Sequence, residues 1–321
     1  MAHPPGPGTS SNMRRSVGPS RTQPQTGWRR SVVILLGVAA LLAGAAPAGA
    51  DVDVSDIRGV TTLPVDHSSQ PATWDWRSHG VVTAVKDHGP CDSSWAFGIT
   101  GLVEGYHAIQ LGTLLSLSEQ ELVDCDAFGT ACSGGRPVGS MRLMIANGGL
   151  AKESSYPYTA APGACKSGSV TPAANIPGAG RVPAGDEQSL QAYVAAGPVL
   201  AMIDAGHSSF DNYVSGVYYE PACSTTHPTD VVLVVGYDTV GGVDYWIAKT
   251  SRGASWGASG YVLMARNRGN NCGIATYALA AANLPIRDAG PAIPALAPAA
   301  LAGLAAILAA LALVALARRG R

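Results

Sequence analysis

The chain has 321 residues and nearly balanced charge, with 21 Lys and Arg against 22 Asp and Glu and a formal net charge of −1. This balance argues against the strongly basic surface of a nucleic-acid-binding protein, so we expect no nucleic acid as a partner. Apolar runs near both ends leave about 210 residues between them, which is enough for one domain with a sizeable core.

The first 50 residues have the order of a secretory signal peptide that follows a polar extension. Arg29-Arg30 precedes the apolar run Val32–Leu42, and Ala48-Gly49-Ala50 offers a small-residue cleavage site. We therefore expect an exported protein. Residues 51–70 are expected to form a short linker, too short for a folded pro-domain before the domain at 71–284.

The domain at 71–284 changes character along its length. Its first half has the apolar patterns and caps of helices, including a capping box that opens at Ser118. The expected helices are Ser93–Gln110, a helix running from Ser118 towards Cys125, Pro137–Asn147 and Glu187–Ala196. The expected strands are Val199–Ile203, Gly216–Tyr219, Val231–Gly236, Asp244–Lys249 and Gly260–Met264, with a loop at Ala179–Gly185. Helices followed by strands predict an α+β arrangement in two lobes.

A Pro/Ala linker at 285–298 leads from the domain to a second apolar run. Ala299–Ala317 is uncharged over about 19 residues, a length that can cross a bilayer as a helix, and the basic tail at 318–321 would then be cytoplasmic. Alternatively, the run belongs to a sorting tag that is removed by processing, since Ile293–Leu296 resembles the short motif of bacterial tags. In both cases we expect the folded part outside the cytoplasm, with the membrane as a partner.

The chain has 6 cysteines, an even number that is typical of a disulfide framework in an exported protein. The cysteines alone leave the pairing open. A set of reduced cysteines scattered through the core is the alternative, and the export signal disfavours it.

The segment Asp87–Phe97 resembles the active-site segment of the papain family of cysteine peptidases, which includes the cathepsins. The family pattern is Gln-Gly-x-Cys-Gly-Ser-Cys-Trp-Ala-Phe, and this chain has His-Gly-Pro-Cys-Asp-Ser-Ser-Trp-Ala-Phe. Further segments resemble the family in the same order: Leu115–Cys125, Ser155–Tyr158, Gly197–Val199, Gly216–Tyr219 and Tyr245–Lys249. The resemblance implies a papain-like two-lobe fold, with a helical lobe, an antiparallel β-barrel-like lobe and a cleft between them. It also implies the disulfides Cys91–Cys132, Cys125–Cys165 and Cys223–Cys272.

All four positions that carry catalysis in the family hold other residues in this chain. Ser94 stands at the nucleophilic Cys, Asp230 at the His, Thr250 at the Asn that orients this His, and His88 at the oxyanion-hole Gln. A serine hydroxyl needs a base, and an aspartate is too weak a base for it. The resemblance therefore indicates a peptidase homologue without activity. As local structure alone, Ser94 is simply a residue type that starts helices.

Other positions of the family site indicate what the altered site does. Arg252 replaces a Trp that lies against the family's His, so we predict an ion pair between Arg252 and Asp230. The resemblance places peptide binding at Gly134, Gly135, Arg136 and Val231. We expect a monomer that binds a peptide or protein in its cleft, without a metal or a cofactor.

Two alternative functions stay open at this point. Ser94 could act in a hydrolase if His88 or His227, which precedes the strand with Asp230, served as its base. The chain could also be a surface protein that neither cuts nor binds peptides.

Overall fold

The computed structural model describes residues 52–64, 67, 70–128 and 130–282. The expected signal peptide, the Pro/Ala linker, the C-terminal apolar run and the basic tail lie outside these residues. Within the described ranges, no helix is both long enough and apolar enough to cross a bilayer.

The α-helices of the described residues are α1 (Ser94–Leu111), α2 (Glu119–Asp124), α3 (Pro137–Ala146), α4 (Glu187–Ala196) and α5 (Ser208–Asp211). Short 3-10 helices lie at Ile57–Gly59, Trp76–His79, Ser167–Ser169 and Asn271–Gly273. The capping expected at Ser118 is present, because its Oγ accepts a hydrogen bond from Glu121 N at 3.0 Å. Gly112 ends α1 in the left-handed conformation, with φ 70°. Four of the five helices thus match the predicted ones closely, and α5 was not predicted.

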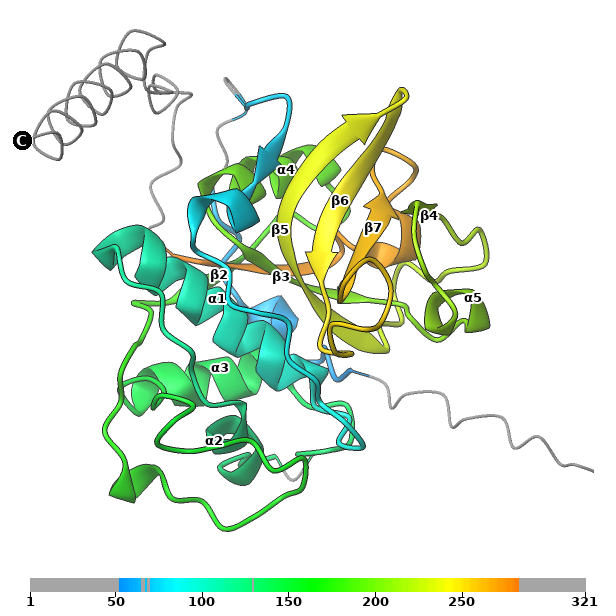
Figure 1. The fold of residues 1–321 in the computed structure, drawn as a ribbon. Coiled ribbons are helices and arrows are strands. Elements are labelled where there is room, and N and C mark those ends of the chain that lie inside the picture. Colours follow the sequence, from blue (N-terminus) through cyan, green and yellow to red (C-terminus); the bar gives the residue numbers. More distant parts are fainter. Residues whose placement is uncertain (1–51, 65–66, 68–69, 129, 283–321) are drawn as a thin grey trace, which may run out of the picture. The chain divides into compact units, whose positions relative to one another are not determined.

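The strands are β1 (Trp74–Asp75), β2 (Ala179–Arg181), β3 (Val199–Ile203), β4 (Val217–Tyr218), β5 (Asp230–Val240), β6 (Val243–Lys249), β7 (Tyr261–Ala265) and β8 (Tyr277–Ala281). They form one sheet in the order β2-β8-β3-β5-β6-β7-β4, with β1 paired to β5. The pair β4–β7 is parallel and the other pairs are antiparallel. The sheet is therefore mixed rather than wholly antiparallel, and the pairing of the described strands does not close into a barrel. Figure 1 shows α1, α2 and α3 together on one side of this sheet.

Strands β2 and β8 are the main departures from the sequence prediction. Ala179–Arg181, expected to be a loop, pairs with β8 through Ala179↔Ala281 and Arg181↔Leu279. Strand β8 is rich in alanine, which has low strand propensity, and it is almost fully buried. Burial against its neighbours decides its conformation, and the local sequence does not indicate this.

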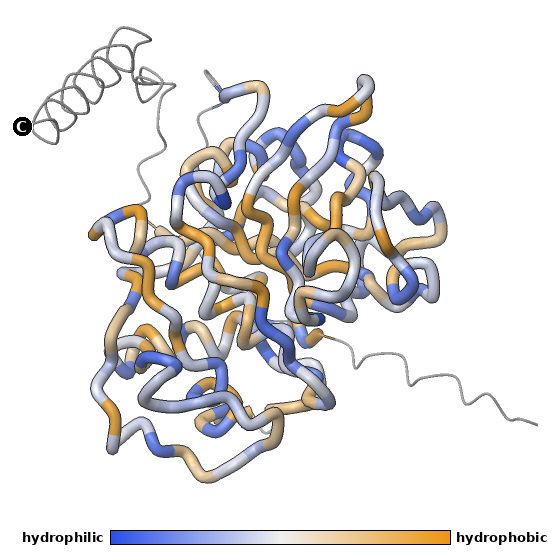
Figure 2. The backbone as a smooth tube through the Cα atoms, viewed as in Figure 1, coloured by the Kyte–Doolittle hydropathy of each residue, from blue (hydrophilic) through white to orange (hydrophobic). Residues whose placement is uncertain are grey.

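The core that positions the site lies between α1 and the sheet. Two glycines of α1 allow a close approach: a Cβ at Gly98 would lie 2.6 Å from Val231, and one at Gly101 would lie 2.8 Å from Leu233. Figure 2 shows hydrophobic residues gathered where α1 meets the strands. Because any larger residue would push α1 away, these glycines set the distance between the start of α1 and the start of β5.

Three disulfides join the cysteines in the pairs that the resemblance implied: Cys91–Cys132, Cys125–Cys165 and Cys223–Cys272. The first one ties the loop before α1 to the loop before α3. It therefore fixes two of the segments from which the expected site is built.

Candidate functional site

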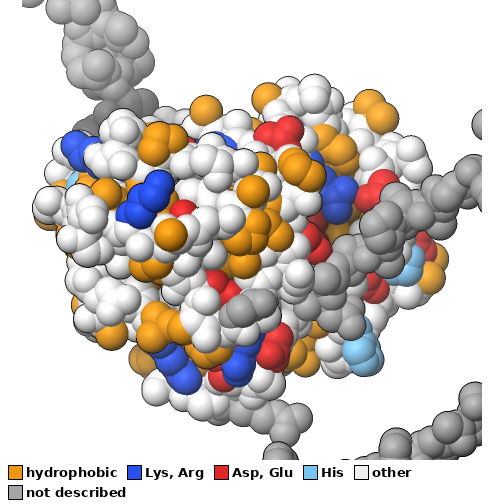
Figure 3. All heavy atoms as spheres, turned by 90° about the horizontal axis from the view of Figure 1, so that it is seen from below, with side chains coloured by type: hydrophobic (Ala, Val, Ile, Leu, Met, Phe, Trp, Pro, Cys, Tyr) orange, Lys and Arg blue, Asp and Glu red, His pale blue; other side chains and the backbone are white. Residues whose placement is uncertain are grey.

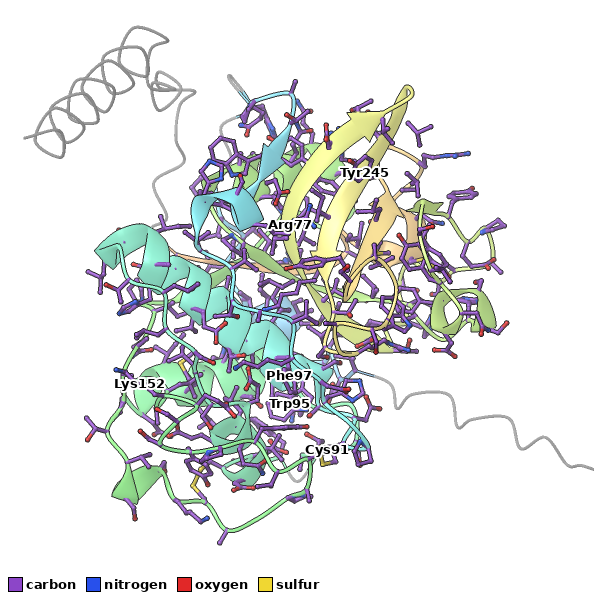
Figure 4. All side chains as sticks on the ribbon, in the orientation of Figure 1. Arg77, Cys91, Trp95, Phe97, Lys152 and Tyr245 are labelled. Atoms are coloured by element: carbon purple, nitrogen blue, oxygen red, sulfur yellow. A yellow bond between two sulfur atoms is a disulfide. The ribbon has the colours of Figure 1, made fainter. Side chains whose placement is uncertain are left out.

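Ser94 is the first residue of α1, after the N-cap Ser93, and it is buried with 2% of its surface exposed. Its Oγ accepts a hydrogen bond from Val231 N at 3.2 Å. Figure 4 shows Trp95 and Phe97 at the end of α1 that lies nearest to Cys91. The side chain at the nucleophile position thus joins the helical lobe to the sheet through a backbone N–H.

Asp230 is the first residue of β5, and its Oδ1 accepts a hydrogen bond from the same Val231 N at 2.7 Å. The hydroxyl of Ser94 and this carboxylate therefore share one donor. In the part of the chain that the structure describes, Val231 N is the only hydrogen-bond partner of Ser94 Oγ. Ser94 Oγ and Asp230 Oδ1 are thus two acceptors of the same N–H, and among the described contacts the Ser94 hydroxyl is not bonded to a basic side chain.

Arg252 binds the other oxygen of this carboxylate, with Nη2 3.2 Å from Asp230 Oδ2. This is the pair of residues between which the sequence predicts an ion pair. Arg252 Nη1 also donates to Asp211 Oδ1 at 2.8 Å, and the guanidinium lies over the rings of Phe210 and Trp256, at 5.1 and 5.5 Å from their centroids. Burial alone would lower the pKa of Arg252, but the two carboxylates outweigh burial and raise this pKa. The cation therefore stays charged and offsets the negative charge of Asp230.

The side chain of Thr250 contacts neither Asp230 nor Ser94, as a residue that orients a catalytic base would have to. Its hydroxyl is buried and donates to Gly260 O at 2.9 Å. The same hydroxyl oxygen, Thr250 Oγ1, accepts a hydrogen bond from Arg252 N at 3.4 Å. Thr250 therefore stabilises the turn between β6 and β7.

The two histidines considered as bases both lie in exposed loops. His88 Nδ1 lies 2.9 Å from Gly89 O, and His227 Nδ1 lies 3.1 Å from Ser224 Oγ. Among the described contacts, neither imidazole has a hydrogen bond to Ser94. The structure thus brings Ser94, Asp230 and Arg252 together, and the imidazoles of both histidines bond to other groups, although His88 N donates to Ser251 O beside the site at 2.8 Å.

The backbone at Gly135, where peptide binding was expected, and that of Pro228 beside β5 both contact residues 52 and 53 of the chain itself. Asp53 N donates to Gly135 O at 3.1 Å, and Val52 N donates to Pro228 O at 3.0 Å. Val52 is buried, with 4% of its surface exposed. Residues 51–70 were expected to be only a linker, so this contact was missed. The one signal for it in the sequence is the set of acidic residues that could face Arg136.

Gly135 has a strict steric requirement at this wall. Its φ is +73°, and a Cβ added to it would lie 2.3 Å from the indole of Trp95. Only glycine can bring this carbonyl so close to the start of α1. The backbone that receives Asp53 N is therefore held in place by the helix that carries Ser94.

A cluster of buried charges lies behind the site and was not predicted. Lys86 Nζ lies 2.7 Å from Glu119 Oε1 and 3.6 Å from Glu104 Oε1, and Lys249 Nζ donates to Thr83 Oγ1 at 2.9 Å. Burial raises the pKa of Glu119 to about 8, with a further contribution from the charge of Glu104 and against the effect of Lys86. Because Lys249 is the last residue of β6, this cluster holds the strand that leads to Thr250.

No site in the described residues is a convincing metal centre. Asp204, His207 and Cys223 bring potential ligand atoms within 4.8 Å of one another, but the sulfur of Cys223 is bonded to Cys272. His207 Nε2 instead lies within hydrogen-bond distance of Asp204 Oδ2, at 3.1 Å.

On the face seen from below, Figure 3 shows acidic, basic and hydrophobic side chains intermixed.

Comparisons with known proteins agree with this architecture. A family model described as papain family cysteine protease matches residues 70–282. Digestive cysteine proteinase 2 of Homarus americanus is 48% identical over 207 residues, which are 64% of this chain and 64% of that protein. Cathepsin L of Sarcophaga peregrina is 47% identical over 222 residues, which are 68% of this chain and 66% of that protein. The chain therefore spans slightly less than two thirds of the length of these relatives.

Solved structures give the same result. The bromelain protease from Ananas comosus in complex with the E64 inhibitor has a TM-score of 0.63 and 40% sequence identity, over 66% of this chain and 98% of that chain. A recombinant stem bromelain precursor has a TM-score of 0.67 and 37% identity, over 73% of this chain and 77% of that chain. The fold and the family match agree over the whole domain, and the chain belongs to the papain family of cysteine proteases.

Proposed function

We propose that this protein is a papain-family pseudopeptidase, which no longer cleaves peptides and holds them in its cleft instead. The observation that carries the loss of cleavage is the environment of Ser94. Its hydroxyl accepts a hydrogen bond from Val231 N, and within the described residues no imidazole is bonded to it. A serine hydroxyl without a base is a poor nucleophile near neutral pH.

The carboxylate at the base position supports the same conclusion. Asp230 already accepts a hydrogen bond from Val231 N and faces the cation of Arg252. One oxygen of the carboxylate thus faces a backbone N–H and the other a guanidinium, and within the described residues neither has a hydrogen bond to the Ser94 hydroxyl. Asp230 is therefore poorly suited to activate a hydroxyl.

Retained peptide binding is supported by the backbone of the cleft. Gly135 and Pro228 each accept a hydrogen bond from a backbone N–H of residues 52 and 53, and main-chain hydrogen bonds of this kind contribute affinity in peptide recognition. The segment that uses these acceptors belongs to the chain itself, so an external peptide must displace it.

Export and attachment to the membrane are part of the proposal. The signal-like pattern before residue 51 and the apolar run at 299–317 support them. Three disulfides in the described domain fit an oxidising compartment.

A reconstruction series tests the loss of catalysis. We expect Ser94→Cys alone to stay inert in an assay with fluorogenic peptides. Adding Asp230→His, Thr250→Asn and His88→Gln should restore measurable cleavage, with Arg252→Trp included because the cation would otherwise face the new imidazole. The matched control carries the same set of changes with Ser94→Ala in place of Ser94→Cys.

The outcome that would overturn this proposal is cleavage by the unmodified protein that is lost in Ser94→Ala. A serine-directed fluorophosphonate that labels Ser94 would point the same way. Either result would make this chain a serine hydrolase on a papain-like fold.

A further inference from the structure

The most informative feature apart from Ser94 and Asp230 is the site that binds the segment Val52–Asp56, which consists of Pro228, Gly135 and Arg136. Its two backbone hydrogen bonds reach opposite walls: Pro228 precedes β5, and Gly135 precedes α3. The segment therefore crosses from the sheet to the helical lobe. Only Val52 and Asp53 make these main-chain contacts, because Ile57 N donates to Val54 O at 3.1 Å and the segment turns there into the 3-10 helix Ile57–Gly59. The segment shows how a short peptide with a turn can be bound by this chain.

Arg136 makes the side-chain contacts with this segment. Its Nε lies 3.1 Å from Asp53 Oδ2 and its Nη2 lies 3.8 Å from Asp56 Oδ2. The Nη2 group also donates to Ser55 Oγ at 3.1 Å. One guanidinium thus contacts two carboxylates and one hydroxyl within the four consecutive residues Asp53–Asp56.

The chain holds both partners of this contact in position. The guanidinium of Arg136 lies 4.6 Å from the centroid of Phe128, which restricts its orientation. On the other side, Ser55 N donates to Asp53 Oδ1 at 2.8 Å. Hydrogen bonds from Ser55, with a smaller contribution from Arg136, lower the pKa of Asp53, so its carboxylate is anionic near neutral pH.

We propose that the cleft is a receptor for acidic peptides that bind as Val52–Asp56 does, with Arg136 as the residue that determines specificity and Val52–Asp56 as the occupant that such peptides displace. This inference rests on the proposed function, namely peptide binding without cleavage. The preferred ligand has an acidic residue, then a small hydroxyl residue two positions later, then a second acidic residue. An apolar residue before this unit fills the place of Val52.

An external peptide can replace the segment Val52–Asp56, because the ion pairs that hold the segment are only partly buried. The side chains of Arg136 and Asp53 are 27% and 42% exposed, and ion pairs of this kind are weak and sensitive to salt. The segment nevertheless competes strongly, since its short tether gives it an effective concentration on the order of millimolar. An external peptide is therefore expected to bind well only when the tethered segment is weakened.

The test uses the full chain and a fluorescent synthetic peptide with the sequence of residues 52–60. The variant Asp53→Asn with Asp56→Asn weakens the tethered segment. In fluorescence anisotropy titrations, we expect this variant to bind the peptide at least about tenfold more tightly than the unmodified protein. Adding Arg136→Gln should remove this gain, with a circular dichroism spectrum to show that the fold is kept.

Two further arms separate this inference from the proposed function. A peptide with Asn at both acidic positions should bind at least about tenfold more weakly to the weakened-segment variant, and a peptide with Lys there should bind to it only after Arg136→Glu. Equal binding of the acidic and amide peptides would overturn the role of Arg136 while leaving peptide binding intact. If no peptide of any charge binds to the weakened-segment variant, peptide binding itself is wrong.

Discussion

The ion pair between Arg252 and Asp230 makes a quantitative prediction about stability. Their side chains are 25% and 10% exposed, so the pair lies between a surface pair and a fully buried one. Removing one partner of a fully buried pair costs about 3–5 kcal/mol, and surface pairs contribute about 0–1 kcal/mol. For Arg252→Met we therefore expect a loss of about 2 kcal/mol in the free energy of unfolding.

Methionine is chosen because it keeps a long side chain against the rings of Phe210 and Trp256. The loss should then reflect the ion pairs rather than a cavity. A double-mutant cycle of Arg252→Met with Asp230→Asn is expected to give a coupling energy of about 1.5 kcal/mol. The matched cycle with Asp211→Asn should give less than about 0.5 kcal/mol, because the side chain of Asp211 is 56% exposed.

Urea unfolding followed by tryptophan fluorescence, with the disulfides intact, measures both cycles. Repeating them in 1 M NaCl provides a second criterion, because salt screens exposed pairs more than buried ones. The reasoning is refuted if the coupling of Arg252 to Asp230 is no larger than its coupling to Asp211. It is also refuted if high salt removes both couplings equally.

Three further predictions concern the same region. Gly135→Ala should destabilise the fold by about 3 kcal/mol, because the new Cβ is strained at positive φ and clashes with the indole of Trp95. The control Gly112→Ala has a similar φ of +70° but open space around it, so it should cost about 1 kcal/mol. Equal losses in thermal unfolding would contradict this. The raised pKa of Glu119, about 8, means that its contribution to stability is present below its unfolded pKa and is lost as pH rises to 8. Between pH 5 and pH 8, urea unfolding should therefore show the wild type losing stability relative to Glu119→Gln, and a constant difference would count against the shift. Ser94→Ala should change the unfolding free energy by less than about 1 kcal/mol, since Val231 N keeps a carboxylate acceptor, and a larger loss in urea titration would show that the hydroxyl has another role.

Much of the fold could be predicted because its signals are local. The cap at Ser118, the apolar pattern of α1 and the β-branched run of β5 act within a few residues, and they indicate the same elements that the structure contains. The residue changes at Ser94 and Asp230 were likewise visible in the sequence, because the segments around them keep the family pattern. Loss of the usual catalytic groups is thus a property of the sequence by itself.

Other features were decided only by tertiary structure. The alanine-rich β8 is a strand because its neighbours bury it, and Asp211 joins Arg252 although 41 positions separate them. The same holds for Asp53, whose N–H donates a hydrogen bond to the carbonyl of Gly135, a residue far along the chain. Contacts between residues so distant in the chain depend on how the lobes pack, and local propensity carries no record of that packing. The sequence therefore determined which side chains stand at this site, and the packing of the lobes decided which groups they contact.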